Sequence, residues 1–191
     1  FDRDSELQYE YISLADRAYD REIKNKTNLI LLEKAFESES KAYIHYEFYA
    51  DDAHEKGFIG LEKLLRALSK SAFFHARNYF SVLNRLQGIE HNLKASQAIE
   101  DEERQRLRSE NLPYSIKEGL ALTQYAFGQA YGAKDNYSTL LPEAIEAYEK
   151  GQDIGHNKYF VCTSCGNMGR LDGELQHCPI CGAPLDKIII L

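Results

Sequence analysis

The sequence predicts a mainly helical protein in which four helices form a bundle and a small metal-binding domain follows. Up to about residue 150, apolar residues recur at spacings of three and four, which is the period of an amphipathic helix. All four cysteines lie further along the chain, in two Cys-x-x-Cys pairs between residues 159 and 181. We therefore expect a helical bundle at 1–151 and a four-cysteine metal domain at 152–191.

The helical pattern divides at glycine, proline and polar stretches. The predicted bundle helices are 4–22, 29–55, 61–86 and 115–150, with Pro113 just before the last. Pro142 should kink or interrupt that last helix, because proline lacks an N–H donor and its ring clashes one turn back. The charged segment 93–110 is compatible with a solvated helix or with a loose linker.

Composition excludes several classes of function. A net charge of -7 argues against nucleic acid, which would require a basic face. No apolar run approaches the roughly 18 residues of a membrane span, and the first residues are too polar for a signal peptide. If the four cysteines share one site, none remains for disulfides. That usage suits the cytoplasm or another reducing compartment.

The thiols form two pairs, Cys162 with Cys165 and Cys178 with Cys181, separated by 12 residues. Each pair is followed by glycine, as a tight turn that directs two sulfurs to one point requires. Four thiolates make a tetrahedral site that suits zinc or a single iron. A module this small cannot fold on its apolar core alone, so the metal is expected to be structural at least.

Several segments resemble one known family. KYFVCTSCG followed by CPICGAP is similar to a rubredoxin. The first bundle helix of the rubrerythrins is similar to residues 34–58, KAFESESKAYIHYEFYADDAHEKGF. The end of their second helix resembles residues 75–83, HARNYFSVL, and their third helix resembles residues 136–151, NYSTLLPEAIEAYEKG. The resemblance implies a ferritin-like four-helix bundle with a C-terminal rubredoxin-like domain. Rubrerythrins pair a rubredoxin-type iron with a di-iron carboxylate centre and typically reduce hydrogen peroxide.

Three bundle residues match that second centre in the family pattern. Glu39 matches the first glutamate ligand, His75 the second-helix histidine, and Tyr46 a tyrosine near the site. The resemblance thus implies a vestigial or possible second metal site at these residues. Alternatively, Glu39 and His75 pair with each other or with a buried tyrosine, because an unpaired buried charge is costly.

Other positions depart from the pattern. Ala72 stands where Glu precedes the histidine, and the positions aligned with the third helix's Glu-x-x-Glu are Ala133 and Asn136. In this alignment the family's fourth helix is absent, and the helix at 4–22 would fill its place. The acidic run 100–103 is interpreted as a solvated helix face. We therefore expect no intact two-metal centre in the bundle.

The favoured function is one-electron transfer through a rubredoxin-type Fe(Cys)4 centre, to or from a redox partner protein. A peroxide reductase is the first alternative, if ligands come from elsewhere, such as a swapped helix of a second subunit. A zinc-ribbon scaffold within a larger complex is the second, and either a homodimer or a hetero-oligomer is expected. Asn167 and Ile188 replace aromatic residues usual in rubredoxins, which favours zinc somewhat, although iron remains the preferred metal.

Overall fold

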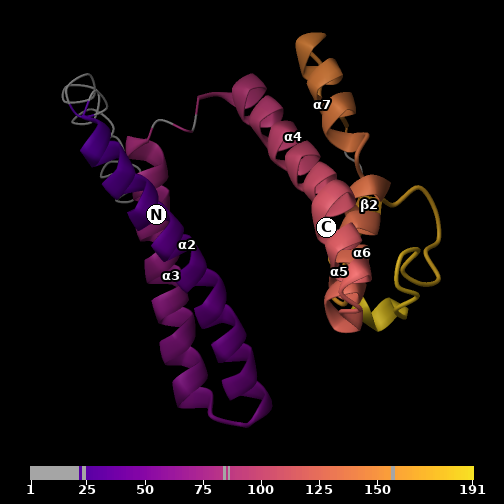
Figure 1. Cartoon of the computed structure of the whole chain (residues 1–191), viewed down its shortest axis with the longest axis horizontal. Helices are drawn as coiled ribbons and strands as arrows, with labels where there is room; N and C mark the ends of the chain where they lie inside the picture. The colour runs from indigo at the N-terminus through magenta and orange to yellow at the C-terminus, as the bar shows by residue number, and fades with distance from the viewer. Residues whose placement is uncertain (1–21, 23–24, 84, 86, 156–157) are drawn as a thin grey trace. The chain divides into compact units, whose positions relative to one another are not determined.

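The computed structural model of the chain describes residues 22, 25–83, 85, 87–155 and 158–191 (Figure 1). The chain divides into two compact units, residues 1–87 and 88–191. Apart from Glu22, the predicted helix at 4–22 lies outside the described residues. A lipid bilayer could not be crossed by any helix among the described residues, since none is both long and apolar enough.

The first unit contains a hairpin of two long helices, α2 (Lys26–Glu55) and α3 (Ile59–Val82), which lie side by side (Figure 1). The side-chain oxygen of Asn25 caps α2 by accepting hydrogen bonds from the N–H groups of Thr27 and Asn28. Gly57 forms the turn between the helices at φ +77°, a conformation that suits glycine. Both predicted helices are confirmed, with each beginning slightly earlier than expected.

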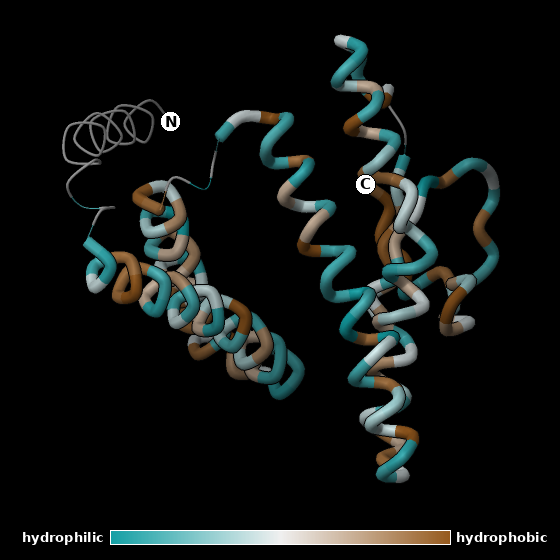
Figure 2. The backbone as a smooth tube through the Cα atoms, turned by 45° about the horizontal axis from the view of Figure 1, so that its top comes forward, coloured by the Kyte–Doolittle hydropathy of each residue, from teal (hydrophilic) through white to brown (hydrophobic). Residues whose placement is uncertain are grey.

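Small residues form the contact between α2 and α3. Five of them are buried, namely Ala50, Ala53, Ser69, Ala72 and Ala76. Aromatic pairs flank this contact, with ring centroids 5.6 Å apart for Phe36–Phe80 and for Tyr43–Phe73. Hydrophobic and hydrophilic residues alternate along both helices (Figure 2). The small side chains let the two backbones approach, so this interface depends on shape more than on large buried residues.

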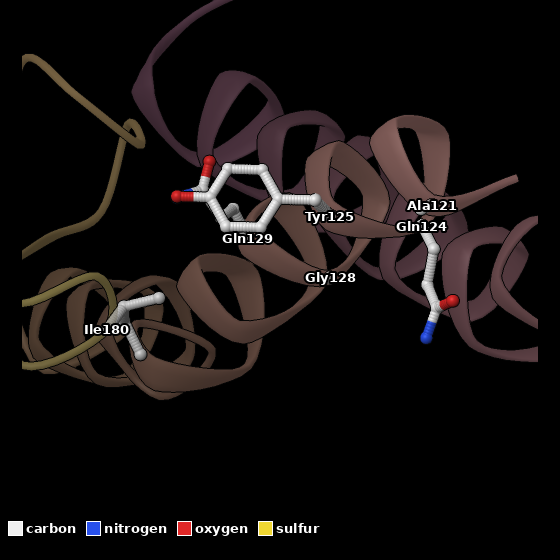
Figure 3. Close-up of a pocket in the computed structure, with 6 residues that line it drawn as sticks. All are labelled: Ala121, Gln124, Tyr125, Gly128, Gln129 and Ile180. Atoms are coloured by element: carbon white, nitrogen blue, oxygen red, sulfur yellow. The ribbon is translucent and has the colours of Figure 1, made fainter.

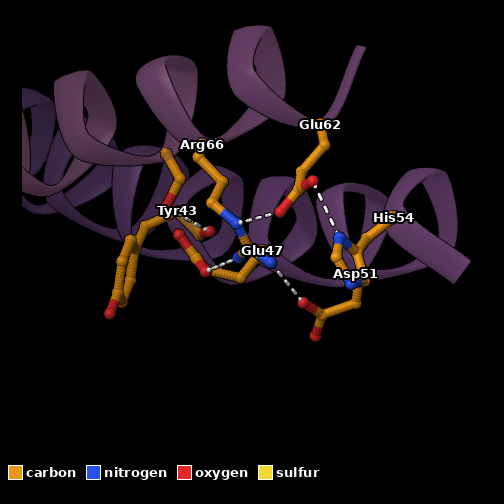
Figure 4. Close-up of polar contacts among 7 residues, drawn as sticks. Tyr43, Glu47, Asp51, His54, Glu62 and Arg66 are labelled. Carbon is orange, nitrogen blue, oxygen red and sulfur yellow. Dashed lines mark hydrogen bonds and ion pairs between the residues drawn. The ribbon is translucent and has the colours of Figure 1, made fainter. Parts of the chain in front are cut away.

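Charged residues link the two helices near their connecting turn. The Arg66 guanidinium of α3 contacts Glu47 and Asp51 of α2, each at 2.9 Å, and Glu62 of its own helix at 3.1 Å (Figure 4). Glu62 also lies 2.9 Å from Nδ1 of His54. The hydrogen bonds from His54 and Arg66 lower the pKa of Glu62. This network favours one register of α3 against α2.

The second unit begins with one continuous helical run from Ile89 to Lys117. It consists of α4 (Ile89–Arg106), a π-helical turn η1 (Leu107–Asn111) and α5 (Leu112–Lys117). The solvated-helix interpretation of 93–110 is therefore correct and the loose linker is wrong. The prediction that Pro113 begins a new long helix is also wrong. Proline removes an N–H donor from a helix, and here the preceding π turn accommodates it within the run.

Two further helices follow, α6 (Ala121–Asn136) and α7 (Leu140–Glu149). The chain turns before α6 at Gly119, which has φ +67°. The predicted interruption ahead of Pro142 is confirmed, because the helix breaks between α6 and α7. The described residues form four long helical stretches, which are α2, α3, the α4–α5 run and α6–α7. Residues 136–151 therefore belong to the fourth of these stretches, and the predicted role of residues 4–22 in the bundle stays a prediction.

The C-terminal module is a three-stranded antiparallel sheet with strand order β2–β1–β3. Its strands are β1 (Tyr159–Cys162), β2 (Met168–Arg170) and β3 (Ile188–Ile190), with a 3-10 turn η2 (Leu185–Lys187) before β3. Phe160 is its buried aromatic residue, 5% exposed. A Cβ atom at Gly169 would lie 2.9 Å from the Phe160 ring, so the strand contact requires glycine there.

Candidate metal centre

The four cysteines converge on one point. Their Sγ atoms all lie within 4.8 Å of one another. The Sγ atoms of Cys162 and Cys181 are 3.7 Å apart, and those of Cys165 and Cys178 are 3.6 Å apart. A tetrahedron with metal–sulfur bonds of about 2.3 Å has sulfur–sulfur edges of roughly 3.8 Å. The donor set therefore fits one tetrahedral zinc or iron ion.

Two local turns with the same hydrogen bonds produce this arrangement. In the first, the Gly166 N–H donates to the carbonyl of Cys162, and in the second the Gly182 N–H donates to that of Cys178, each at 2.9 Å. Both glycines have positive φ, +73° and +72°, which allows the backbone to reverse behind each cysteine pair. The predicted pairing of each motif with a following glycine thus has a direct structural cause.

Backbone N–H groups face the sulfurs and influence their ionisation. Burial disfavours the Cys178 thiolate, but hydrogen bonds from the N–H groups of Cys181 and Ile180 outweigh it and lower its pKa to about 7. Burial raises the pKa of Cys165, although the Asn167 N–H opposes this shift. The N–H groups of the second cysteine turn therefore favour the charged form of Cys178.

The metal module contacts helices α6 and α7 within the same unit. Asn136 Nδ2 of α6 donates to Asn167 Oδ1 at 3.1 Å, and Arg170 contacts Glu143 of α7 at 2.7 Å. Ile180, in the second cysteine turn, lies beside α6 at Gly132, where a Cβ atom would be 3.5 Å from its Cγ2. These contacts tie the four-cysteine site to the helices rather than leaving it on a free linker.

The three predicted bundle residues lie on the α2–α3 hairpin. Nδ1 of His75 approaches Oε2 of Glu39 to 3.6 Å. The Glu39 side chain is 31% exposed and that of His75 is 55% exposed. Tyr46 is half-buried two turns further along α2. The structure therefore brings Glu39 and His75 together, as the pairing interpretation expects, and metal binding by these residues stays a prediction.

A second polar cluster, which we call the Glu100 cluster, lies between α4 and α6. Oε2 of Glu100 accepts hydrogen bonds from Nζ of Lys134 at 2.7 Å and from the Tyr137 hydroxyl at 3.0 Å. The Lys134 side chain is only 19% exposed and that of Glu100 is 34% exposed. The interpretation of residue 100 as part of a solvated face was wrong, because its carboxylate faces α6.

The Glu100 cluster bears on the comparison with the family pattern. Glu100 and Glu103 have Glu-x-x-Glu spacing on α4, in the third described helical stretch, and the match of that family motif to Ala133 and Asn136 stays a prediction. Ferritin-like di-metal proteins carry Glu-x-x-His, three residues apart, on two of their helices. The two residues that face Glu100 are also three apart, Lys134 on α6 and Tyr137 directly after its last residue, an ammonium and a phenol. The charge of the Glu100 carboxylate is thus neutralised by Lys134, which belongs to the same unit.

The phenol of Tyr137 is held in its neutral form. Burial and, after it, the Glu100 carboxylate raise the pKa of Tyr137 above the ordinary value of 10.0. A tyrosine pKa raised by folding adds stability that is complete below the unfolded value and disappears as pH rises through the folded value.

We therefore expect Tyr137 to remain protonated at pH 11, where an ordinary tyrosine of pKa about 10 is mostly ionised. Ring-carbon resonances of labelled tyrosine would follow this, with the Tyr137→Phe protein assigning the signal. Glu100→Gln should move the titration towards lower pH. A Tyr137 signal that titrates together with those of ordinary tyrosines would contradict the burial and hydrogen bond described here.

Comparison with known proteins identifies the family of the chain. The family model described as Rubrerythrin matches residues 31–161, more than half of the chain. Rubrerythrin-2 of Clostridium acetobutylicum is 24% identical over 179 residues, covering 86% of this chain and 97% of the relative. A structure of nigerythrin in a mixed-valence state is 20% identical to this chain, with a TM-score of 0.47. A structure of its fully reduced, all-ferrous state is 19% identical, with a TM-score of 0.45. Each comparison covers 85% of this chain and 86% of the other. With a mainly helical chain, a three-stranded C-terminal sheet and a cluster of four cysteines, the protein belongs to the rubrerythrin family.

Proposed function

We propose that this protein transfers single electrons to or from a partner protein through a rubredoxin-type Fe(Cys)4 centre. The observation that supports this most directly is the convergence of four thiol sulfurs at tetrahedral spacing in a rubrerythrin-family chain. Iron bound by four thiolates supplies a ferric/ferrous couple. The turns at Gly166 and Gly182 fix the sulfurs through backbone hydrogen bonds, so ligand positions need to change little between the two oxidation states.

The exposure of the thiols favours electron exchange at one side of the module. Cys162 and Cys178 are each 1% exposed, whereas Cys165 and Cys181 are half-buried and approach the surface. The Cys178–Cys181 turn also borders an open groove of about 430 Å³ along α6 (Figure 3). The groove is lined by Ala121, Gln124, Tyr125, Gly128, Gln129 and Ile180. A redox partner bound over this turn would come close to the two outer sulfurs.

The Glu100 cluster supports the electron-carrier proposal over the peroxide-reductase alternative. A di-metal centre of the ferritin-like type uses two Glu-x-x-His motifs to complete its ligand set. Lys134 and Tyr137 offer an ammonium and a neutral phenol opposite Glu100, and an ammonium cannot act as a metal ligand. We therefore place the redox chemistry at the cysteines.

Metal analysis and reversible redox titration of the purified full-length chain test the proposal. We expect one iron per chain, a red ferric form, and bleaching by one electron with full return of colour on reoxidation. Hydrogen peroxide consumption should be negligible with any electron donor. One colourless zinc per chain without redox activity would instead support the scaffold, and two further irons with rapid peroxide turnover would support the peroxide reductase.

A further inference from the structure

Asn167 is a fully buried polar residue beside the metal site, with an exposed fraction of 0%. It follows the first cysteine turn, where its carbonyl accepts a 2.8 Å hydrogen bond from the Cys162 N–H. The corresponding residue after the second turn is Ala183, whose carbonyl accepts the same bond from Cys178. The two turns therefore share a backbone pattern, but only the first adds an amide side chain, and a buried amide needs partners.

Two contacts define the partners of this amide, and a third fixes its neighbour Asn136. Asn167 Oδ1 accepts from Asn136 Nδ2 at 3.1 Å, and Asn167 Nδ2 lies 4.0 Å from Cys178 Sγ, a long N–H···S contact. Asn136 Nδ2 also donates to the carbonyl of Met168 at 3.3 Å. The amide thus joins α6 to a sulfur of the opposite cysteine turn.

The orientation of both amides follows from their contact with the Met168 carbonyl. The Met168 carbonyl can only accept, so Asn136 must present its NH₂ group to it. The second hydrogen of that NH₂ group then meets Asn167, which must present its oxygen. The NH₂ group of Asn167 is consequently the end that faces Cys178.

We infer that Asn167 is a positioning residue for the metal centre, which donates to the Cys178 sulfur and is held in that orientation by Asn136 of α6. A donor that faces a thiolate stabilises its negative charge. Reduction of an Fe(Cys)4 site adds negative charge to the sulfurs, so the same donor raises the reduction potential. This second effect rests on the function proposed above, whereas the effect on metal affinity holds for any divalent ion.

Leucine substitutions test the contributions of the two asparagines one at a time. Asn167→Leu keeps the branched shape of the side chain and removes the donor to Cys178. Asn136→Leu leaves Asn167 in place but removes the group that orients it. Ser164→Ala, at an exposed position inside the first cysteine turn, is the matched control.

The affinity measurement uses Co²⁺ competed with a chromophoric chelator, because Co²⁺ reports both affinity and its tetrahedral thiolate spectrum. We expect Asn167→Leu to weaken binding by about 10-fold, the lower end for a group that supports a ligand. Asn136→Leu should weaken Co²⁺ binding by a smaller factor, and Ser164→Ala should leave Co²⁺ binding unchanged. In the iron-loaded full chain, both leucine variants should also show a lower midpoint potential.

Unchanged Co²⁺ affinity in both leucine variants would overturn the inference. An effect of Asn167→Leu with none from Asn136→Leu would overturn the part assigned to α6. If the iron form has no reversible couple, the electron-transfer proposal fails, but the Co²⁺ measurement still decides the role of Asn167. Should Asn167→Leu fail to fold, Asn136→Leu carries the test, since its site is outside the metal module.

Discussion

Replacement of Cys162 by serine is expected to release the bound metal and unfold residues 158–191 while the helices stay folded. The module has three short strands and one buried aromatic residue, so its apolar core cannot offset the entropy of ordering the chain. Structural zinc contributes about 10–16 kcal/mol in comparable small domains. Loss of one of four thiolates removes enough of this to shift the module to its unfolded state.

Limited proteolysis with mass spectrometry would locate the change, and far-ultraviolet circular dichroism would report the helices. We expect new cleavage sites within 158–191 and little loss of helical signal. Ser164→Ala is again the matched control, because it alters the same turn without removing a ligand. Protection of the segment in a metal-free Cys162→Ser protein would show that the four-cysteine site is not what folds it.

Replacement of Lys134 by methionine is expected to destabilise the α4–α6 contact by about 1–3 kcal/mol. The change keeps the length and volume of the side chain but removes the ammonium 2.7 Å from Glu100. Exposed ion pairs contribute about 0.2–1 kcal/mol, and breaking a buried pair costs about 3–5 kcal/mol. With exposures of 19% and 34%, this pair lies between those limits.

Urea unfolding of each protein would provide the free energies. Lys150→Met is a suitable control, because Lys150 contacts Glu146 in a pair whose side chains are 60% and 67% exposed. We expect it to cost under about 0.5 kcal/mol. Combining Lys134→Met with Glu100→Gln should recover part of the loss, since the unpaired carboxylate is then gone. Equal effects of Lys134→Met and Lys150→Met would contradict a special role for the Glu100 cluster.

The sequence predicted the four-cysteine site well because all of its determinants are local. Each turn is encoded by two cysteines and the glycine that follows, within a few residues. The hairpin of α2 and α3 was also predictable, since its helices are long and amphipathic with polar or glycine residues at their ends. Such features need no knowledge of distant parts of the chain.

The Glu100 cluster was missed because its contacts join distant residues and because one proline was misinterpreted. Pro113 predicts a helix start from the sequence, whereas in the structure it lies inside the α4–α5 run. The sequence alone shows no partner for Glu100, and its acidic neighbours indicate a solvated face. Asn167 posed the same difficulty, because a buried amide in that position makes sense only with Asn136 opposite.

The π turn at Leu107–Asn111 determines which face of the helix is occupied by the residues before and after it. Leu107 and Ser115 are both buried, 2% and 0% exposed, although they are eight residues apart. In a regular α-helix, eight residues would rotate them about 80° from one another. A π turn absorbs one additional residue, which reduces that difference to about 20° and returns both to the same face. The chain should therefore tolerate the deletion of one residue from 108–111, which would leave the two side chains seven positions apart on a regular helix and still pointing the same way.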